Sequence, residues 1–216
     1  QLDQGKIDAA AGTLRSALAM RRRTLGEEDP ATARSMTYLG LALFRKADYK
    51  EAQPLFEGAM SRLRRAYPGG HVDLADSLTG LAMLHYGKGE YAKAEPLLRE
   101  ALAMQRRLLG EEHPQVAETL NNLGSVISRL GRDAEAEPLQ RDALALLRKI
   151  RGPDHPRVAT LLNNLGLMLY ARGDTAGAEP LLRESLQIRR AKLGALHPDL
   201  AQSLSNLGLL LHNTGR

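Results

Sequence analysis

Cysteine is absent from the 216-residue sequence, which excludes disulfide bonds and thiolate metal ligands. Tryptophan is also absent, and only six tyrosines and two phenylalanines occur. Few aromatic side chains are therefore available to stack on nucleic-acid bases. The sequence has no run of about 18 apolar residues and no signal-peptide pattern. We therefore expect a soluble, cytoplasmic protein that does not enter a membrane.

The composition is that of an ordinary folded domain. Apolar residues make up 43% and charged residues 25%, a balance that argues against disorder. The formal net charge of +5 is modest for this length and indicates at most a preference for acidic partners. The chain opens on Gln1 rather than methionine, from which we expect it to be part of a longer protein.

Three short patterns recur along the chain with a common period of 42 residues. The first is a polar residue followed by proline, at Asp29-Pro30, His113-Pro114, His155-Pro156 and His197-Pro198, with His71-Val72 in the remaining position. The second is a proline that follows Ala-Glu or Ala-Gln, at Pro54, Pro96, Pro138 and Pro180. The third contains leucine followed by a small residue, at Leu39-Gly40, Leu81-Ala82, Leu123-Gly124, Leu165-Gly166 and Leu207-Gly208. Three independent series in one register indicate a tandem array.

Each repeat has the pattern of two helices. From Pro114 to about Leu130, apolar residues recur at steps of three and four, as one face of a helix requires. The segment around Gly131 interrupts this pattern, and a second periodic segment runs to about Ile150. Proline suits the first helical position, so the preceding residue, such as His113, is expected to be the N-cap.

The register divides the chain into four full repeats, at residues 29–70, 71–112, 113–154 and 155–196. Residues 1–28 are predicted to be the second helix of a truncated repeat, and residues 197–216 the first helix of another. The prediction is a single all-α array over residues 1–216, with about ten antiparallel helices. One helix pair buries too little apolar surface to offset the entropy of ordering it, so the pairs must stack as an α-solenoid. We expect the uncovered ends to be cuts through a longer array.

The repeat resembles a known family. Leu123-Gly124, Ala136 and Ala143 have the spacing of a tetratricopeptide repeat, with small residues where its two helices pack closely. The longer unit, with residues 109–114, 119–123 and 136–139, resembles the kinesin light chain subtype, although Thr79-Gly80 replaces its Asn-Asn pair in one repeat. The resemblance implies a right-handed superhelix whose first helices line a concave face that holds peptides from other proteins.

The candidate binding residues are those that the register places on the concave face of the first helices. An asparagine amide both donates and accepts hydrogen bonds, so it can hold a peptide backbone without reading its sequence. In the alternative interpretation, Asn122 and Asn164 bond only between adjacent helices. The candidates are Arg34, Thr37, Leu41, Phe44, Arg45, Met83, Tyr86, Asn121, Asn122, Ser125, Arg129, Asn163, Asn164, Leu167, Tyr170 and Asn206, with Asp76, Thr79, Glu118, Ser128, Leu209 and His212 at related positions.

Glu111-Glu112-His113 could be read as a metal site or an acid–base pair. The histidine recurs once per repeat, and neighbouring helices lie about 8–10 Å apart, whereas zinc–nitrogen bonds are about 2.0–2.1 Å. We therefore expect a helix cap and a turn, and predict no metal, cofactor or catalytic residue. A ladder of arginines could contact nucleic acid, but cations at helix C-termini are also favoured by the helix dipole, and nucleic acid is the minor hypothesis. The ladder is Arg22, Arg64, Arg106, Arg148 and Arg190.

The predicted function is that of a non-catalytic scaffold that binds a peptide segment of a partner protein. The alternative is a sensory or autoinhibitory region of a larger protein whose effector enzyme, a protease or an NTPase, lies outside this sequence. The apolar faces of the terminal helices could also pair end to end.

Overall fold

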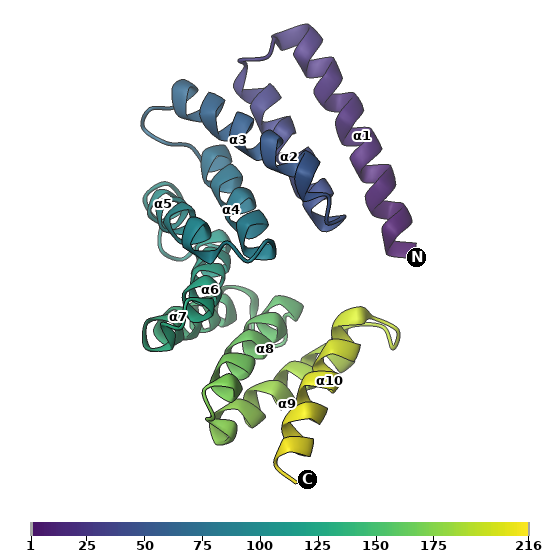
Figure 1. Cartoon of the computed structure of the whole chain (residues 1–216), viewed down its shortest axis with the longest axis vertical. Coiled ribbons are helices and arrows are strands. Elements are labelled where there is room, and N and C mark those ends of the chain that lie inside the picture. Colours follow the sequence, from purple (N-terminus) through teal and green to yellow (C-terminus); the bar gives the residue numbers. More distant parts are fainter. Residues whose placement is uncertain (1, 216) are drawn as a thin grey trace. The chain divides into compact units, whose positions relative to one another are not determined.

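The computed structural model describes residues 2–215, and within this range the chain contains ten α-helices and no strand (Figure 1). The helices are α1 (Leu2–Leu25), α2 (Pro30–Arg45), α3 (Tyr49–Ala66), α4 (Val72–Gly87), α5 (Tyr91–Leu109), α6 (Pro114–Arg129), α7 (Asp133–Arg151), α8 (Pro156–Ala171), α9 (Thr175–Lys192) and α10 (Pro198–Asn213). The predicted all-α fold and its number of helices are therefore confirmed. No described helix is long and apolar enough to cross a membrane.

The first helix of each repeat begins at the predicted cap. Asp29 accepts a hydrogen bond from the N–H of Ala31 at 2.8 Å. Each histidine at this position accepts in the same way through its imidazole Nδ1, and for His113 the donor is the N–H of Gln115 at 3.2 Å. The bond satisfies one of the backbone donors that have no partner in the first turn. The Glu111-Glu112-His113 stretch is thus a turn that ends in the N-cap of α6, as the sequence predicted.

The second helices of the four full repeats, α3, α5, α7 and α9, carry a proline near their second turn. Pro96 lies inside α5 and Pro138 inside α7, and both helices continue past the proline. Each of these helices is capped at its C-terminus by a glycine with positive φ, Gly110 at 84° and Gly152 at 83°. A residue with a Cβ is strained in this conformation, so glycine ends the helix at little cost.

The chain forms two compact units, residues 1–110 and 111–216. In unit 1, the core is built around the fully buried Phe56 of α3. A Cβ added to Gly40 of α2 would lie 2.9 Å from the Phe56 ring, and one added to Gly80 of α4 would lie closer still. Two first helices thus approach one aromatic side chain, and only a residue without a side chain leaves room for the ring.

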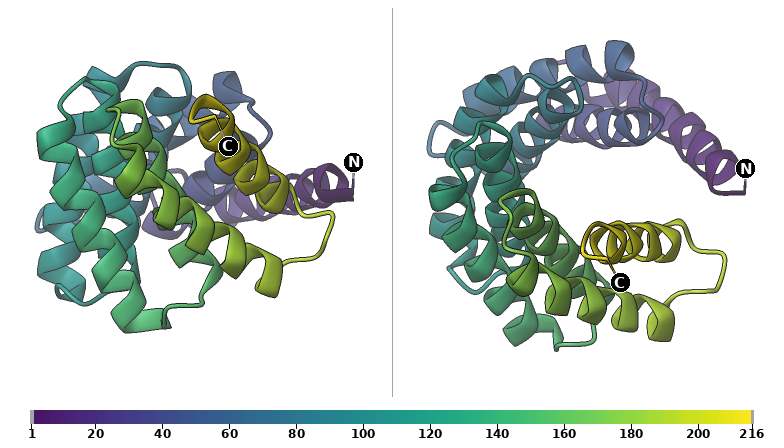
Figure 2. Two further views of the ribbon diagram at one scale, coloured as in Figure 1. Left: turned by 90° about the horizontal axis from the view of Figure 1, so that it is seen from below. Right: turned by 60° about the horizontal axis from the view of Figure 1, so that its bottom comes forward.

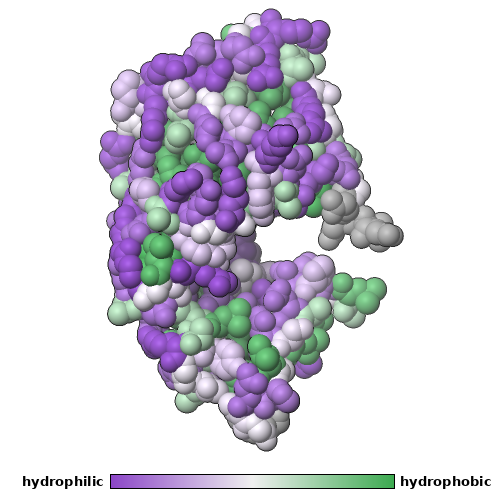
Figure 3. Space-filling model, in the orientation of Figure 1, coloured by the Kyte–Doolittle hydropathy of each residue, from purple (hydrophilic) through white to green (hydrophobic). Residues whose placement is uncertain are grey.

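In unit 2, α6 pairs with α7 and α8 with α9, and α10 packs on α9 and α8. The fully buried side chains include Leu123, Ile127, Leu147, Leu162 and Leu165. Figure 2 shows the successive antiparallel helices of each unit lying side by side. The face seen in Figure 3 is mainly hydrophilic, with apolar residues in small separate patches.

Within each unit the first helices approach one another more closely than the second helices do. The backbone of α2 contacts that of α4, and α8 contacts both α6 and α10. No such approach joins α3 to α5 or α7 to α9 in the described part of the chain. The first helices therefore form the tighter layer of each unit, which is the layer on which the candidate residues lie.

Candidate functional site

In unit 1, the candidate residues of α2 differ in exposure. Thr37 is buried, and its Oγ1 lies 2.6 Å from Oγ of Ser77 in α4. Arg34 and Leu41 are half-buried, whereas Arg45 is exposed at the end of α2. The hydroxyl pair links adjacent first helices, and the longer side chains around it remain accessible.

Aromatic residues gather where the first helices of unit 1 end. The ring of Phe44 stacks on Tyr49 with centroids 5.7 Å apart, and Tyr86 meets Tyr91 edge-on at 5.3 Å. Phe44 and Tyr86 are half-buried, as is Met83 one turn earlier on α4. These contacts fix the rings, which lowers the entropy lost when a partner side chain packs against them.

Asp76 of α4 is a half-buried carboxyl group on the first-helix layer of unit 1. Burial, and after it the nearby Asp73 carboxylate, raise the pKa of Asp76 to about 6, while His71 opposes the shift. A group with this pKa titrates close to neutral pH, so a cationic side chain placed beside it would favour its ionised form.

In unit 2, asparagines of adjacent first helices bond to one another. Asn164 donates through Nδ2 to Oδ1 of Asn121 at 3.2 Å, and Asn206 donates to Oδ1 of Asn163 at 2.8 Å. Asn121 is 7% and Asn163 is 6% exposed. We call these two bonds the asparagine ladder. The ladder satisfies polar groups that would be costly to bury alone, and it fixes the spacing of α6, α8 and α10.

The other candidates of unit 2 retain accessible surface. Asn122, Asn164, Ser125, Leu167 and Tyr170 are half-buried. Arg129 is exposed, as are His212 and Asn213 at the end of α10, and the side-chain amide of Asn213 donates to the Tyr170 hydroxyl.

The sequence candidates thus form two groups. Thr37, Asn121 and Asn163 are buried and join neighbouring helices, with the half-buried Asn164 and Asn206 as the partners of the two asparagines, while the rest lie at the surface of the same layer. Residue type and register gave no signal for this division, because positions on a helix face do not reveal how closely the next helix approaches.

Three of the five arginines of the ladder on the second helices pair with carboxylates. Arg64 lies 2.6 Å from Glu100, and Arg148 lies 2.6 Å from Glu184. Arg22 contacts Glu27 at 2.9 Å. Each pair neutralises a charge that phosphate binding would use. Together with helix-end positions in the last turns of α1, α3 and α7, these pairs support the structural role of the ladder.

No cluster of three or more potential metal-ligating side chains occurs among the residues that the structure describes. The histidines of the repeat junctions instead serve as N-caps of α4, α6, α8 and α10.

The pair His85–Glu90 in unit 1 is one of the buried polar contacts that sequence reasoning missed. Nδ1 of His85 lies 2.6 Å from Oε2 of Glu90, and His85 is only 8% exposed. The corresponding residues in the other full repeats are Leu43, Ile127 and Leu169. A histidine at a position that is otherwise aliphatic was the available signal, since such a residue needs a polar partner when it is buried.

Antiparallel helix pairs stacked with a 42-residue period place the chain in the class of helical repeat proteins. The profile of the tetratricopeptide repeat family matches residues 1–65, 36–107, 73–149, 115–191 and 158–216, which together extend over the whole chain. The chain belongs to the tetratricopeptide repeat family, as the sequence patterns predicted.

Solved structures give the same fold. The crystal structure of BtubC (BKLC) from P. vanneervenii is similar with a TM-score of 0.78 and 25% sequence identity, covering 97% of this chain and 84% of that one. Crystal structures of a putative kinesin light chain from P. anserina, with nearly identical TPR-like repeats, are also similar. One has a TM-score of 0.70 and 24% identity, covering 88% of this chain and 89% of that one. No curated protein sequence matches the chain.

Proposed function

We propose that this chain is a non-catalytic scaffold that binds an extended peptide segment of a partner protein on its first-helix layer. Membership of the tetratricopeptide repeat family supports protein–protein interaction as the general role. The observation that carries the finer proposal is the division of the first-helix residues into a buried linking group and an accessible group. Helix spacing is fixed beneath a surface that offers amides, hydroxyls, apolar side chains and arginines.

In unit 2, the proposed contacts are polar. Amide and hydroxyl groups at Asn122, Ser125 and Asn164 bind the backbone of an extended peptide, because these groups both donate and accept. The exposed Arg129 binds an acidic side chain, since guanidinium–carboxylate bonds are charge-assisted and directional. Leu167 and Tyr170 supply the neighbouring apolar surface.

In unit 1, the proposed contacts are mainly apolar. Leu41, Phe44, Met83 and Tyr86 form the surface for an aliphatic or aromatic anchor, with Arg45 beside it for an acidic group. Rigid aromatic side chains are effective in this role because they bury a large area at low entropic cost.

A displayed-peptide selection on the full 216-residue chain tests the proposal. A groove variant carries Asn122→Ala and Arg129→Ala, and a control variant carries Arg141→Ala on the second helix α7, where Arg141 pairs only locally with Glu137. All three proteins are first matched for thermal stability. A motif that the parent and the control enrich, and the groove variant does not, supports the proposal. The same motif in all three proteins, or enrichment by none, rejects it.

A further inference from the structure

The turn between α3 and α4 differs in charge from the turns at the corresponding places of the array. Residues 25–28 and residues 109–112 both read Leu-Gly-Glu-Glu, whereas residues 67–70 read Tyr-Pro-Gly-Gly. Two glycines, Gly69 and Gly70, thus stand where two other turns carry glutamates. The exchange removes two negative charges from this turn.

Where the second glutamate of the turn is present, it pairs with a cation near the end of the following second helix. Glu28 contacts Arg65 of α3, and Glu112 contacts Lys149 of α7. In both pairs the cation lies 37 residues after the glutamate. Each pair cancels one positive charge of the second helix.

The cation is kept in α5, although its glutamate is not. Arg107 lies 37 residues after Gly70, and its guanidinium donates to the carbonyl oxygen of Gly69 instead. A Cβ added to Gly70 would lie 2.7 Å from Nη2 of Arg107, so the guanidinium lies where a side chain of residue 70 would begin. Among the residues that the structure describes, no carboxylate forms an ion pair with Arg107. Its positive charge is therefore not cancelled.

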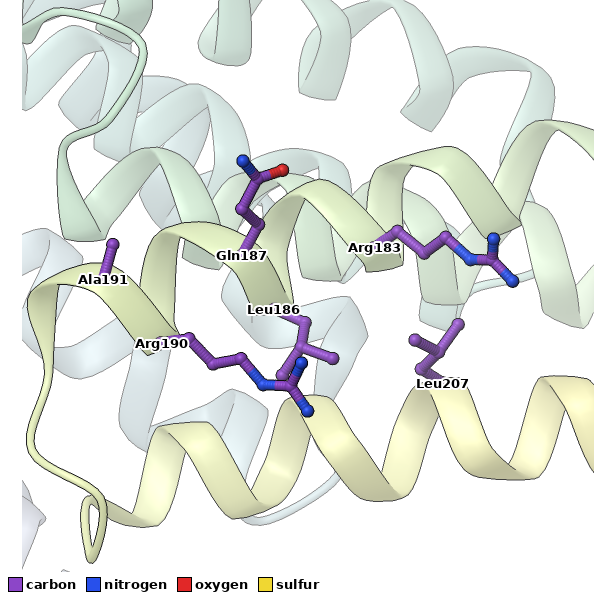
Figure 4. A pocket seen from close by; sticks show the side chains of 6 residues that line it. All are labelled: Arg183, Leu186, Gln187, Arg190, Ala191 and Leu207. Carbon is purple, nitrogen blue, oxygen red and sulfur yellow. The ribbon is translucent and has the colours of Figure 1, made fainter.

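The turn between α7 and α8 shows the opposite change. It keeps an acidic residue, Asp154, but the residue 37 positions later is Ala191. Figure 4 shows Ala191 near the end of α9, with the side chain of the adjacent Arg190 pointing toward α10. Among the cation positions 65, 107, 149 and 191, only residue 107 combines a cation with a turn that lacks the acid.

A pocket of about 330 Å³ lies at the turn between α3 and α4. Its lining includes the buried Leu74 of α4 and Met104 of α5, together with the half-buried Tyr67. The ring of Tyr67 is held by stacking on His71, with ring centroids 4.2 Å apart. The pocket thus has a fixed apolar side, and Arg107 lines it as well. We call it the turn pocket.

The charges that line the turn pocket favour a singly charged anion. Arg64 lies 2.6 Å from Glu100, so these two groups neutralise each other, and Arg107 leaves one net positive charge. The Glu100 carboxylate repels a second negative charge, which disfavours a dianion such as phosphate. A carboxylate matches the planar guanidinium of Arg107, and the apolar side suits the stem that carries it.

We propose that the turn pocket binds a glutamate or aspartate side chain of a partner protein through Arg107. The partner's carboxylate takes the part that Glu28 and Glu112 have at the other turns. An apolar residue next to it in the partner packs on Met104 and Tyr67. The turn pocket is separate from the first-helix layer of the proposed function, so either site can fail its test without the other.

The probe is the capped peptide acetyl-Leu-Gly-Glu-Glu-amide, which has the sequence of residues 25–28 and 109–112. It is titrated into the isotope-labelled full chain, and NMR follows the side-chain Nε–H of Arg107 and the backbone amides of Gly69 and Gly70. We expect saturable shifts at these groups with a Kd on the order of millimolar, because a short ligand makes one exposed ion pair and a small apolar contact. A matched peptide with glutamine in place of both glutamates should bind about fivefold more weakly.

Two chain variants test whether Arg107 carries the binding. Arg107→Gln removes the charge from an exposed side chain and should reduce binding of the glutamate peptide to that of the glutamine peptide. Gly69→Glu supplies an internal carboxylate at a residue where an added Cβ meets no atom within 4 Å, so it should fold as the parent does and weaken binding by competition. Lys149→Gln, at the same repeat position in α7, is the control and should leave the shifts at Arg107 unchanged. Thermal melts compare the fold of all the variants with the parent.

Absence of saturable shifts at Arg107, or equal binding of the two peptides, would overturn the proposal. So would binding that neither Arg107→Gln nor Gly69→Glu weakens. Tighter binding of inorganic phosphate than of the glutamate peptide, lost in Arg107→Gln, would reject a protein ligand in favour of a phosphate site. Shifts at Arg45 or Arg129 without shifts at Arg107 would reject the turn pocket and assign the peptide to the first-helix layer.

Discussion

The imidazole of His85 and the carboxylate of Glu90 form a pair 2.6 Å apart at the junction of α4 and α5. Glu90 occupies the N-cap position of α5 but makes no side-chain cap bond, whereas Asp48 and Asp174 cap α3 and α9. The carboxylate is thus diverted from the helix terminus to the buried histidine. A buried histidine, at a position that is aliphatic in the other full repeats, thus engages the carboxylate of the neighbouring turn.

This relationship makes stability sensitive to acid. The hydrogen bond from His85 is the largest cause that lowers the pKa of Glu90 from 4.5, and Lys93 and Lys88 lower it further. The unfolded state therefore binds more protons than the folded state below about pH 5, so stability falls as pH decreases there. His85→Leu should reduce this acid dependence and keep the melting temperature at pH 7 within a few degrees of the parent. Thermal melts from pH 3.5 to 7 measure both effects, and an unchanged acid slope would contradict the assignment.

Asp76 should give the opposite pH dependence. Its pKa is raised from 3.8 to about 6, first by burial and then by Asp73, so the folded state binds more protons than the unfolded state between these values. Stability contributed by the protonated form is lost as pH rises through this window. Asp76→Asn should raise the unfolding free energy by about 1–2 kcal/mol at pH 7.5, and by much less at pH 4. A lower stability of the asparagine variant at pH 7.5, measured by urea denaturation, would show that the ionised carboxylate is stabilised by a partner.

The asparagine ladder should show energetic coupling between α8 and α10. Asn206→Ala removes the donor to Oδ1 of the buried Asn163 and should cost about 1–2 kcal/mol, because the acceptor loses its partner. A double-mutant cycle with Asn163→Ala should give a coupling energy of about 0.5–1.5 kcal/mol. Ser205→Ala, next to Asn206 but exposed, is the control and should be nearly neutral. Additive effects of the two asparagine changes would mean that the bond contributes nothing.

Two helix glycines at the same position of the repeat should respond differently to alanine. Gly208→Ala places a methyl group in open space, and the higher helix propensity of alanine should stabilise α10 by about 0.5–1 kcal/mol. Gly166→Ala gains the same propensity, but its methyl group would lie 2.9 Å from Leu182 Cγ and must displace that side chain. It should therefore destabilise the protein, as overpacked cores do, by about 1–3 kcal/mol. Melting temperatures of both variants test this, and equal shifts would argue against the tight contact.

Local sequence patterns were sufficient for the fold. Proline at the first helical position, a polar cap before it and apolar residues at steps of three and four define α6 as Pro114–Arg129, within one residue of the expected end. Residues 1–28, predicted to be the second helix of a truncated repeat, contain the single helix α1, which ends at Leu25. The family and the helix-pair architecture followed because each unit repeats the same local signals.

The candidate site was less fully determined by sequence. The register assigned Asn121, Asn122 and Asn163 to one helix face, but it did not distinguish buried from accessible amides. That distinction depends on how closely the next first helix approaches. The hydrogen bond between His85 and Glu90 could not be predicted from the sequence either. His85 lies on α4 and Glu90 at the start of α5, so the bond depends on the turn between the two helices.

The sequence by itself determined the helices, their pairing and the 42-residue register, because caps, prolines and apolar periodicity act within a few residues along the chain. Only the tertiary structure decided which amides link neighbouring helices and which arginines are neutralised by carboxylates. These properties depend on distances between side chains about 40 residues apart, such as Asn163 and Asn206 or Arg148 and Glu184. Such distances are fixed by packing between helices and not by local propensity.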